Sequence, residues 1–218
     1  MPGTLPARCP VCRAASPAAF GTFDGRGYWR CETCGARGLD PRHYPDAATE
    51  RAEYDRHDNR VDDPGYRRFL DKLASPLKAR LAPRSRGLDY GCGPGPALAA
   101  MLREAGHEMA LFDPVYAPDP APLAATYDFI TCTEVAEHFH TPAAEFDRLG
   151  ALLRPGGVLA VMTCFVTDDA RFGGWHYRKD PTHVVFYRAG TLRHLAAARG
   201  WSCAIPRKDV ALMTVPGP

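Results

Sequence analysis

The chain has 218 residues, of which 45% are hydrophobic and 24% are charged. This balance is that of an ordinary soluble globular protein, and the length suffices for one α/β domain with a small appendage. The first eight residues lack the apolar core of a signal peptide, and the longest apolar stretch, around 158–166, is too short to cross a bilayer. We therefore expect no membrane partner and a cytoplasmic location in which cysteines stay reduced.

Charge is distributed unevenly along the sequence. Residues 1–86 contain 16 Lys and Arg against 11 Asp and Glu, whereas residues 87–218 contain 11 against 14. The net charge of +5 in the first part is too small for a basic arm that grips nucleic acid by charge alone. The charge does not indicate a nucleic-acid partner and does not exclude one, and it leaves the oligomeric state open.

Residues 1–40 are predicted to form a zinc ribbon. Cys9 and Cys12 form one C-x2-C pair, Cys31 and Cys34 form another, and eighteen residues separate the pairs. Reduced thiols at this double spacing are typical of a tetrahedral zinc site, and Asp24-Gly25 between them predicts a hairpin turn. Two disulfides are the alternative, disfavoured by the absence of a signal peptide. Small buried residues are expected at the remaining cysteines, which are Cys92, Cys132, Cys164 and Cys203.

Residues 41–86 are predicted to link the ribbon to the main domain. One helix is expected near residues 47–56. A second helix is expected over residues 65–81, where apolar side chains recur at helical spacing and face the core, with a kink at Pro76.

The main domain, residues 87–218, opens with a strand at 88–90 and a glycine-rich loop that contains Gly91, Gly93 and Gly95. A helix over 96–105 and a strand over 109–112 follow, and the strand ends at Asp113. Glycines let the backbone approach a ligand beneath a helix N-terminus, and an acid at this point can hold the hydroxyls of a ribose. The dinucleotide fingerprint G-x-G-x-x-G would need a small residue at position 96, where this chain has proline.

The sequence Asp89-x-Gly91-x-Gly93-x-Gly95 resembles motif I of the class I S-adenosylmethionine-dependent methyltransferases. Residues 127–130 resemble the fourth strand of that family, and residues 152–159 resemble its turn into the fifth strand. The resemblance implies a doubly wound, Rossmann-like α/β fold with a seven-stranded sheet. Fourteen residues separate Asp113 from Asp128, and four of them are prolines, so the third strand is expected to be short or missing. S-adenosylmethionine would be bound by Asp89, Gly91, Cys92, Gly93, Gly95, Asp113 and Thr133.

The second half of this domain is predicted to complete the sheet. A helix over 141–153, a strand over 158–164, a helix over 190–199 and strands over 201–206 and 210–215 are expected. A long loop over 165–187, rich in aromatic and charged residues, lies where the strand ends place a pocket.

The acceptor side carries two carboxylates and two histidines. If residues 134–138 form a helical turn, Glu134, Glu137 and His138 share one face, and His183 arrives from the long loop. This pattern resembles the ubiquinone-pathway O-methyltransferases and the small-RNA 2′-O-methyltransferases, and in the latter two Glu and two His hold a divalent metal. The resemblance leaves two hypotheses. Either the four residues bind Mg²⁺, Mn²⁺ or Zn²⁺, or His138 or His183 acts as a general base whose pKa the carboxylates raise.

The sequence thus predicts an S-adenosylmethionine-dependent methyltransferase that methylates a hydroxyl of a small molecule, with Glu134, His138 and His183 as catalytic residues. An RNA-directed 2′-O-methyltransferase is one alternative. A non-catalytic zinc-ribbon adaptor that binds the cofactor is another.

Overall fold

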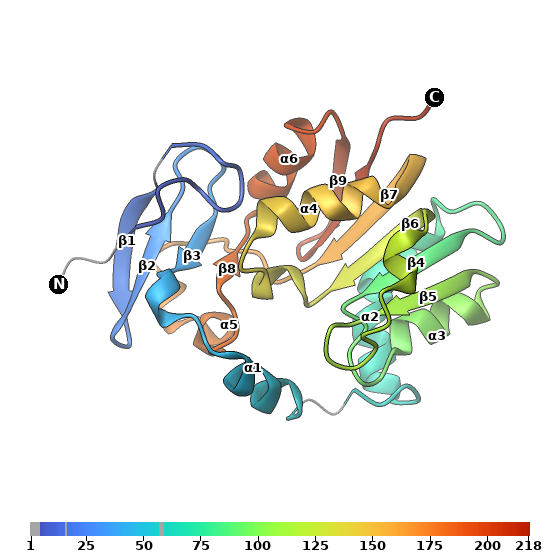
Figure 1. The fold of residues 1–218 in the computed structure, drawn as a ribbon, viewed down its shortest axis with the longest axis horizontal. Coiled ribbons are helices and arrows are strands. Elements are labelled where there is room, and N and C mark those ends of the chain that lie inside the picture. Colours follow the sequence, from blue (N-terminus) through green and yellow to red (C-terminus); the bar gives the residue numbers. More distant parts are fainter. Residues whose placement is uncertain (1–4, 16, 57–58) are drawn as a thin grey trace.

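The computed structural model describes residues 5–15, 17–56 and 59–218, and within them the chain forms two β-sheets. The larger sheet has the strand order β5-β4-β6-β7-β10-β9, and the smaller has the order β1-β2-β3-β8. Figure 1 shows the smaller sheet beside one end of the larger one. The strands of the larger sheet are β4 (Arg86–Tyr90), β5 (Glu108–Phe112), β6 (Tyr127–Thr133), β7 (Leu153–Met162), β9 (Ser202–Arg207) and β10 (Val210–Thr214).

The larger sheet is mostly parallel and is covered on both faces. Strands β5, β4, β6 and β7 are parallel neighbours, and β10 runs antiparallel between β7 and β9. Helices α2 and α3 share one hydrophobic core with one face of the sheet, and α4 and α6 share another core with the opposite face. This layering confirms the doubly wound α/β prediction. The helices are α2 (Pro64–Lys78), α3 (Ala97–Glu104), α4 (Pro142–Ala151) and α6 (Ala189–Ala197).

The third strand of the family sheet, which we expected to be short or missing, is missing from the part of the chain that the structure describes. Between β5 and β6 the backbone forms only a bridge between Asp113 and Ala117 and a short 3₁₀ turn, η2 (Ala121–Ala124). The four prolines of this segment lack the amide hydrogens that a sheet strand needs, which explains why β5 remains the edge.

The predicted hairpin of the ribbon is present. Strands β1 (Ala18–Phe23) and β2 (Arg26–Arg30) pair antiparallel around a two-residue turn, in which Asp24 and Gly25 both have left-handed φ values, 50° and 74°. Such turns match the twist of the flanking strands. Strand β3 (Arg37–Leu39) pairs with β2 and follows the second pair of cysteines.

The long loop is more structured than the sequence suggested. It contains the turn η4 (Phe172–Gly174), the helix α5 (His176–Lys179) and the strand β8 (Val185–Phe186). Strand β8 pairs antiparallel with β3, so part of the main domain completes the sheet of the ribbon.

The segment between ribbon and main domain contains η1 (Pro41–His43) and α1 (Ala47–Tyr54), followed by α2. The predicted inward face of the second helix is confirmed, because Leu70, Leu73 and Leu77 are buried. The division of the chain at residues 40 and 86 stays a prediction.

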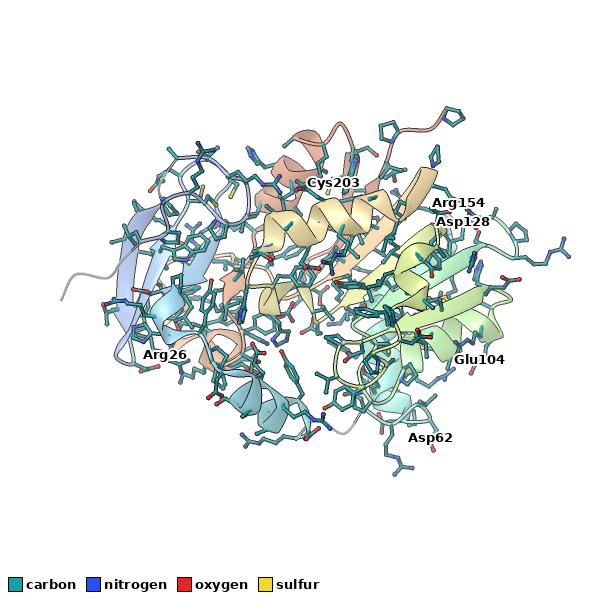
Figure 2. The ribbon with its side chains drawn as sticks, in the orientation of Figure 1. Arg26, Asp62, Glu104, Asp128, Arg154 and Cys203 are labelled. Carbon is teal, nitrogen blue, oxygen red and sulfur yellow. The ribbon has the colours of Figure 1, made fainter. Side chains whose placement is uncertain are left out.

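The two ends of the parallel strands differ in character. At the amino ends, Asp128 accepts hydrogen bonds from the Arg86 amide and from Arg154, each at 2.8 Å, and this pair lies at the end of the sheet away from the ribbon (Figure 2). The carboxyl ends open into a cavity, the position at which open α/β sheets bind ligands.

Candidate functional site

The four ribbon cysteines converge on one point. Their sulfurs lie within 4.8 Å of one another, with Cys9 3.9 Å from Cys34 and Cys12 3.7 Å from Cys31. A zinc ion with Zn–S bonds of about 2.3 Å at tetrahedral angles would place its sulfurs about 3.8 Å apart. All eight cysteines are free thiols, so the disulfide alternative is wrong for this structure.

The two C-x2-C loops share one backbone design. Arg13 N donates to the Cys9 carbonyl at 2.8 Å, and Gly35 N donates to the Cys31 carbonyl at 2.9 Å. Arg13 and Gly35 both have left-handed φ values, which close each loop and point its two sulfurs toward the other loop. The cluster is therefore compatible with a zinc ion.

The remaining cysteines do not resemble nucleophiles. Cys132 is fully buried, and burial raises the pKa of this thiol well above its usual value. Burial also raises the pKa of Cys92 to about 12, so both thiols stay protonated at neutral pH.

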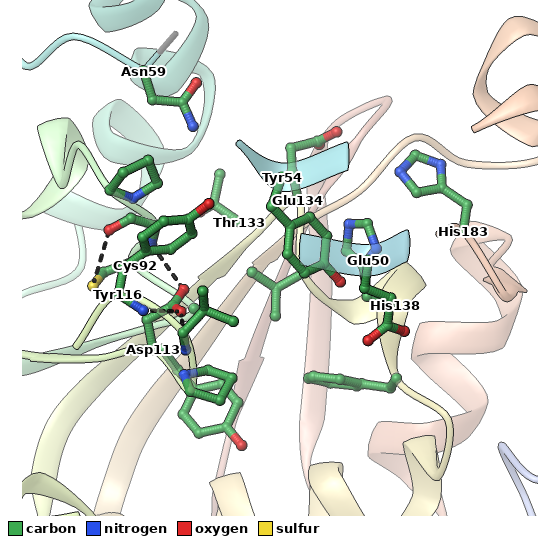
Figure 3. A pocket seen from close by; sticks show the side chains of 18 of the residues that line it. Glu50, Tyr54, Asn59, Cys92, Asp113, Tyr116, Thr133, Glu134, His138 and His183 are labelled. Atoms are coloured by element: carbon green, nitrogen blue, oxygen red, sulfur yellow. Dashed lines mark hydrogen bonds between the residues drawn. The ribbon is translucent and has the colours of Figure 1, made fainter. Parts of the chain in front are cut away.

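A cavity of about 860 Å³ joins the glycine-rich loop to the acceptor side. Figure 3 shows Cys92, Asp113 and Tyr116 on one side of it, and Glu134, His138 and His183 on the other. The predicted cofactor residues that line it are Gly91, Cys92, Gly93, Asp113 and Thr133. Asp89 and Gly95 are not among its described lining residues.

Asp113 ties the end of β5 to the glycine-rich loop. Its carboxylate accepts hydrogen bonds from the amides of Gly93 at 3.0 Å, Val115 at 2.8 Å and Tyr116 at 3.0 Å. A carboxylate has about four lone-pair positions, so one remains for a ligand hydroxyl. The side chain is thus held in place before any ligand arrives.

Asp89 lies beneath the loop at the end of β4. Burial raises the pKa of Asp89 to about 6, against the opposing effect of a hydrogen bond that Thr131 Oγ1 donates at 2.7 Å. Gly95 is required for a different reason: a Cβ there would lie 1.6 Å from the backbone oxygen of Asn59, so only glycine allows the segment before α2 to cross the loop.

Glu137, His138 and His183 form a compact cluster at the acceptor end, where His138 and His183 line the cavity and the buried Glu137 is not among its described lining residues. One ligand atom from each lies within 4.8 Å of the others. His138 Nδ1 lies 3.0 Å from the Thr182 carbonyl, and His183 Nδ1 lies 2.7 Å from the Tyr177 carbonyl. A carbonyl only accepts, so each Nδ1 carries the proton and each Nε2 keeps a free lone pair. This second-sphere arrangement is typical of metal-binding histidines.

Glu137 has a buried carboxylate oxygen without a hydrogen-bond partner. Its side chain is 0% exposed, Oε1 accepts a 2.5 Å hydrogen bond from the Tyr177 hydroxyl, and Oε2 has no partner. An unpaired carboxylate oxygen in such a place costs several kcal/mol unless a cation or a donor reaches it.

Glu134 does not belong to the same turn. The 3₁₀ turn η3 (Ala136–His138) begins two residues later, and Glu134 has a left-handed φ of 53°. The expected helical face of Glu134, Glu137 and His138 is therefore wrong, because Glu134 and Val135 both lie outside helical backbone conformation. Glu134 lies outside the three-residue cluster and shares with it the Tyr177 hydroxyl, at 3.2 Å.

The protonation of these groups also differs from expectation. Burial lowers the pKa of His138 and outweighs the charge of Glu137, which acts in the predicted direction, so the predicted net rise of this pKa is wrong. Burial and the charge of Glu137 raise the pKa of Glu134 to about 9. Near neutral pH the site therefore has a neutral imidazole at His138 and a protonated carboxyl at Glu134.

Several lining residues were missed at the level of sequence. Glu50, Tyr54, Tyr66 and Phe69 come from the segment that was treated as a linker, and Tyr54 packs edge-on against His138 with ring centroids 5.3 Å apart. The only sequence signal for the three aromatic residues is their position near the end of the first predicted helix and the start of the second.

No helix in the described part of the chain has both the length and the apolar character needed to cross a membrane.

Two solved structures share this fold. One of them is the 1,6-didemethyltoxoflavin-N1-methyltransferase of Burkholderia thailandensis, solved with bound S-adenosylhomocysteine. It is 20% identical to this chain with a TM-score of 0.54, and the match covers 90% of this chain and 97% of that one. An O-methyltransferase family protein from the same organism is 14% identical with a TM-score of 0.51, over 80% and 65% of the two chains.

Sequence comparison agrees with the fold. A ubiquinone biosynthesis O-methyltransferase of Xylella fastidiosa is 31% identical over 106 residues, a match that spans 36% of this chain and only 42% of that relative. The model of the methyltransferase domain family matches residues 62–204, well over half of the chain. The protein therefore belongs to the methyltransferase domain family.

Proposed function

We propose that the protein transfers the methyl group of S-adenosylmethionine to a hydroxyl of a small molecule. The observation that supports this most is one cavity that joins Asp113 and the glycine-rich loop to the cluster of Glu137, His138 and His183. A cofactor bound at the first end would present its methyl group toward an acceptor at the second. The name of the Xylella relative, an O-methyltransferase, supports a hydroxyl as acceptor.

The cofactor supplies an electrophilic methyl group on a sulfonium, and the chain supplies position. The free lone pair of Asp113 would accept from one ribose hydroxyl, and the backbone at Gly91 and Gly93, both with positive φ, would allow close approach. Holding two reactants in line is the main contribution that such a site makes to the rate.

On the acceptor side, Glu137 Oε2, His138 Nε2 and His183 Nε2 would hold a divalent cation, whose chemistry is to lower the pKa of an acceptor hydroxyl. The donor set fits, because two imidazoles with fixed tautomers and one carboxylate lacking a partner suit Mn²⁺, Zn²⁺ or Mg²⁺. In the site without a cation, burial and the charge of Glu137 raise the pKa of Glu134, and its carboxyl would donate a hydrogen bond to the acceptor in that state. The alternative is that the neutral His138 itself removes the acceptor proton.

The size and lining of the cavity favour a small acceptor. A volume of about 860 Å³ is that of a cofactor pocket with room for a compact second molecule, and Tyr54, Tyr66 and Phe69 offer flat apolar surfaces. These rings suit a phenolic or catechol-like acceptor better than a charged polymer. We also propose that the four ribbon cysteines hold one structural zinc ion.

The test is methylation by the purified chain with labelled S-adenosylmethionine, offered phenols, catechols or total RNA, with and without chelator. We expect labelled small-molecule ethers, a loss of product with chelator and recovery with Mg²⁺ or Mn²⁺. Glu137→Gln should abolish turnover and leave S-adenosylhomocysteine binding within about twofold, whereas Asp119→Asn, which changes an exposed carboxylate outside the described lining of the cavity, should change neither.

The alternatives give different results in the same assay. Label in RNA alone would support the RNA-directed reading, and cofactor binding without product from any pool would support the adaptor. Turnover that survives chelator but is lost in His138→Ala would favour the general-base version.

A further inference from the structure

One residue, Val184, joins the ribbon to the acceptor cluster through backbone hydrogen bonds. The Leu39 amide of β3 donates to the Val184 carbonyl at 2.9 Å, and the Val184 amide donates to the Glu137 carbonyl, also at 2.9 Å. His183 directly precedes Val184 in the chain. The backbones of Glu137 and His183 are therefore set relative to each other by a hydrogen-bonded row that ends in the ribbon.

Both cysteine loops brace this row. Cys31 N donates to the Ala36 carbonyl at 2.9 Å, and β3 begins at the next residue. The Pro10 carbonyl, between Cys9 and Cys12, accepts from the first turn of α4, the helix that follows His138 in the chain. The two cysteine loops are therefore connected by backbone hydrogen bonds to the segments on both sides of the acceptor cluster, β3 with Val184 and the start of α4.

Arg178 is the buried side chain at this junction. Its guanidinium is 0% exposed, donates to the Gly173 carbonyl at 2.8 Å and to the Tyr28 hydroxyl at 3.2 Å, and forms an ion pair with Asp24 in the hairpin turn. A buried guanidinium needs this complete set of acceptors, so the hairpin and α5 cannot separate without leaving a buried charge unpaired.

The residue before Arg178 faces the opposite way. The Tyr177 hydroxyl forms hydrogen bonds with Glu137 and Glu134, and the Tyr177 carbonyl accepts a hydrogen bond from Nδ1–H of His183. Displacement of Arg178 would move these contacts directly, because the two residues are adjacent in a four-residue helix.

Aromatic packing and a second ion pair support the same junction. Phe172 packs against Phe20, Tyr28 and Phe186 with ring centroids 5.1 to 5.4 Å apart. Arg37, a buried residue of β3, forms two hydrogen bonds with Asp169 at 3.0 and 2.7 Å. These contacts join all three strands of the ribbon to Asp169, Phe172 and Phe186 of the long loop.

We propose that the ribbon is a positioning element of the acceptor site, and that Arg178 is the positioning residue through which its hairpin holds His183 against Glu137 and His138. This inference rests on the proposed function in so far as that cluster receives the acceptor. In the described part of the chain, Asp113 and the glycine-rich loop are held by β4 and β5 rather than by the ribbon.

The test compares Arg178→Met with Arg154→Met, which removes an ion pair at the far end of the large sheet (Figure 2). Amide hydrogen exchange and the ¹⁵N signals of the His183 imidazole are measured in the full chain, with binding of S-adenosylhomocysteine as reference. In Arg178→Met we expect exchange at Leu39 and Val184 to rise about tenfold or more and the His183 signals to shift, with cofactor-product affinity within about twofold. Arg154→Met should show none of these changes.

A milder variant covers the case in which Arg178→Met does not fold. Asp24→Asn removes only the exposed partner of the ion pair, and we expect the same changes at about threefold. Cys34→Ser should reproduce the Arg178→Met pattern from the other side of the junction. Unchanged Val184 exchange and unchanged His183 signals in the folded variants would overturn the inference.

These readouts need no acceptor, so they separate this inference from the proposed function. If they change as expected while no hydroxyl is ever methylated, positioning stands and the proposed function fails. If Arg178→Met methylates a true acceptor at the normal rate, the inference is wrong and the proposed function stands.

Discussion

Asp89 offers a test of electrostatics beneath the glycine-rich loop. Burial raises the pKa of this carboxyl from an ordinary 3.8 to about 6. That difference corresponds to about 3 kcal/mol, the free energy by which ionisation of Asp89 weakens the folded state at high pH. Asp89→Asn keeps an oxygen to accept from Thr131 and removes the charge.

The sign of the pH dependence follows from the raised pKa. Between about pH 4 and 6 the folded chain retains a proton that the unfolded chain releases, so the free energy of unfolding falls as pH rises through this window. We therefore expect Asp89→Asn without cofactor to match the wild type near pH 4 and to exceed it by up to about 3 kcal/mol at pH 8. The melting temperature should differ by about 2–4 °C per kcal/mol.

The assay is urea unfolding of both proteins at pH 4 to 8, with Asp128→Asn as the matched control. Although burial opposes it, the hydrogen bond from the Arg86 amide and the charge of Arg154 lower the pKa of Asp128. Its removal should therefore weaken the fold at neutral pH, and this loss should vanish at low pH, the reverse of the Asp89 pattern. A stability difference for Asp89→Asn that stays constant from pH 4 to 8 would refute the reasoning.

The other predictions concern the two ends of the cavity and the ribbon. Asp113→Ala should remove most of the thermal stabilisation by S-adenosylhomocysteine, which is about 2.7 kcal/mol for the wild type at a ligand concentration of a hundred times Kd, and an equal shift would contradict the ribose role. Gly95→Ala places a Cβ against the Asn59 carbonyl and should weaken cofactor binding about tenfold or more by calorimetry; unaltered affinity would show that the crossing is not needed. Purified chain should contain one zinc by elemental analysis and Cys34→Ser much less, with melting of the ribbon ahead of the large sheet; a zinc-free wild type counts against the site. Titration with Mn²⁺ should detect a second cation site that is lost in Glu137→Gln, and equal binding by the variant would place the cation elsewhere.

Features that depend on neighbouring residues could be predicted from the sequence. Two C-x2-C loops separated by a hairpin signal led to the four-sulfur cluster, because each loop is short enough to determine its own shape. The glycines at 91, 93 and 95 indicated the ligand loop, since left-handed backbone and close approach favour that residue type. Four prolines after Asp113 indicated a missing strand, since proline cannot supply the amide hydrogens.

The acceptor site could be predicted only in part. The convergence of His183 on Glu137 and His138 followed from parallel strands that end at one edge of a sheet. The place of Glu134 did not, because its left-handed backbone depends on how β6 leaves the sheet rather than on local spacing. Likewise, the positions of Tyr54 and Tyr66 in the cavity depend on how α1 and α2 pack in the folded chain, which local spacing does not give.

The pKa values and the role of the ribbon belong to tertiary structure alone. Spacing alone suggests that carboxylates would raise the pKa of His138, but the packing around the ring removes water and reverses the sign. The pairing of β8 with β3 joins residues about 150 positions apart, and a strand of two residues is too short to show a periodic pattern that could predict it. Short-range sequence determined the shapes of the loops that bind, whereas burial and long-range pairing, which exist only in the folded chain, decided their charge states and what holds them together.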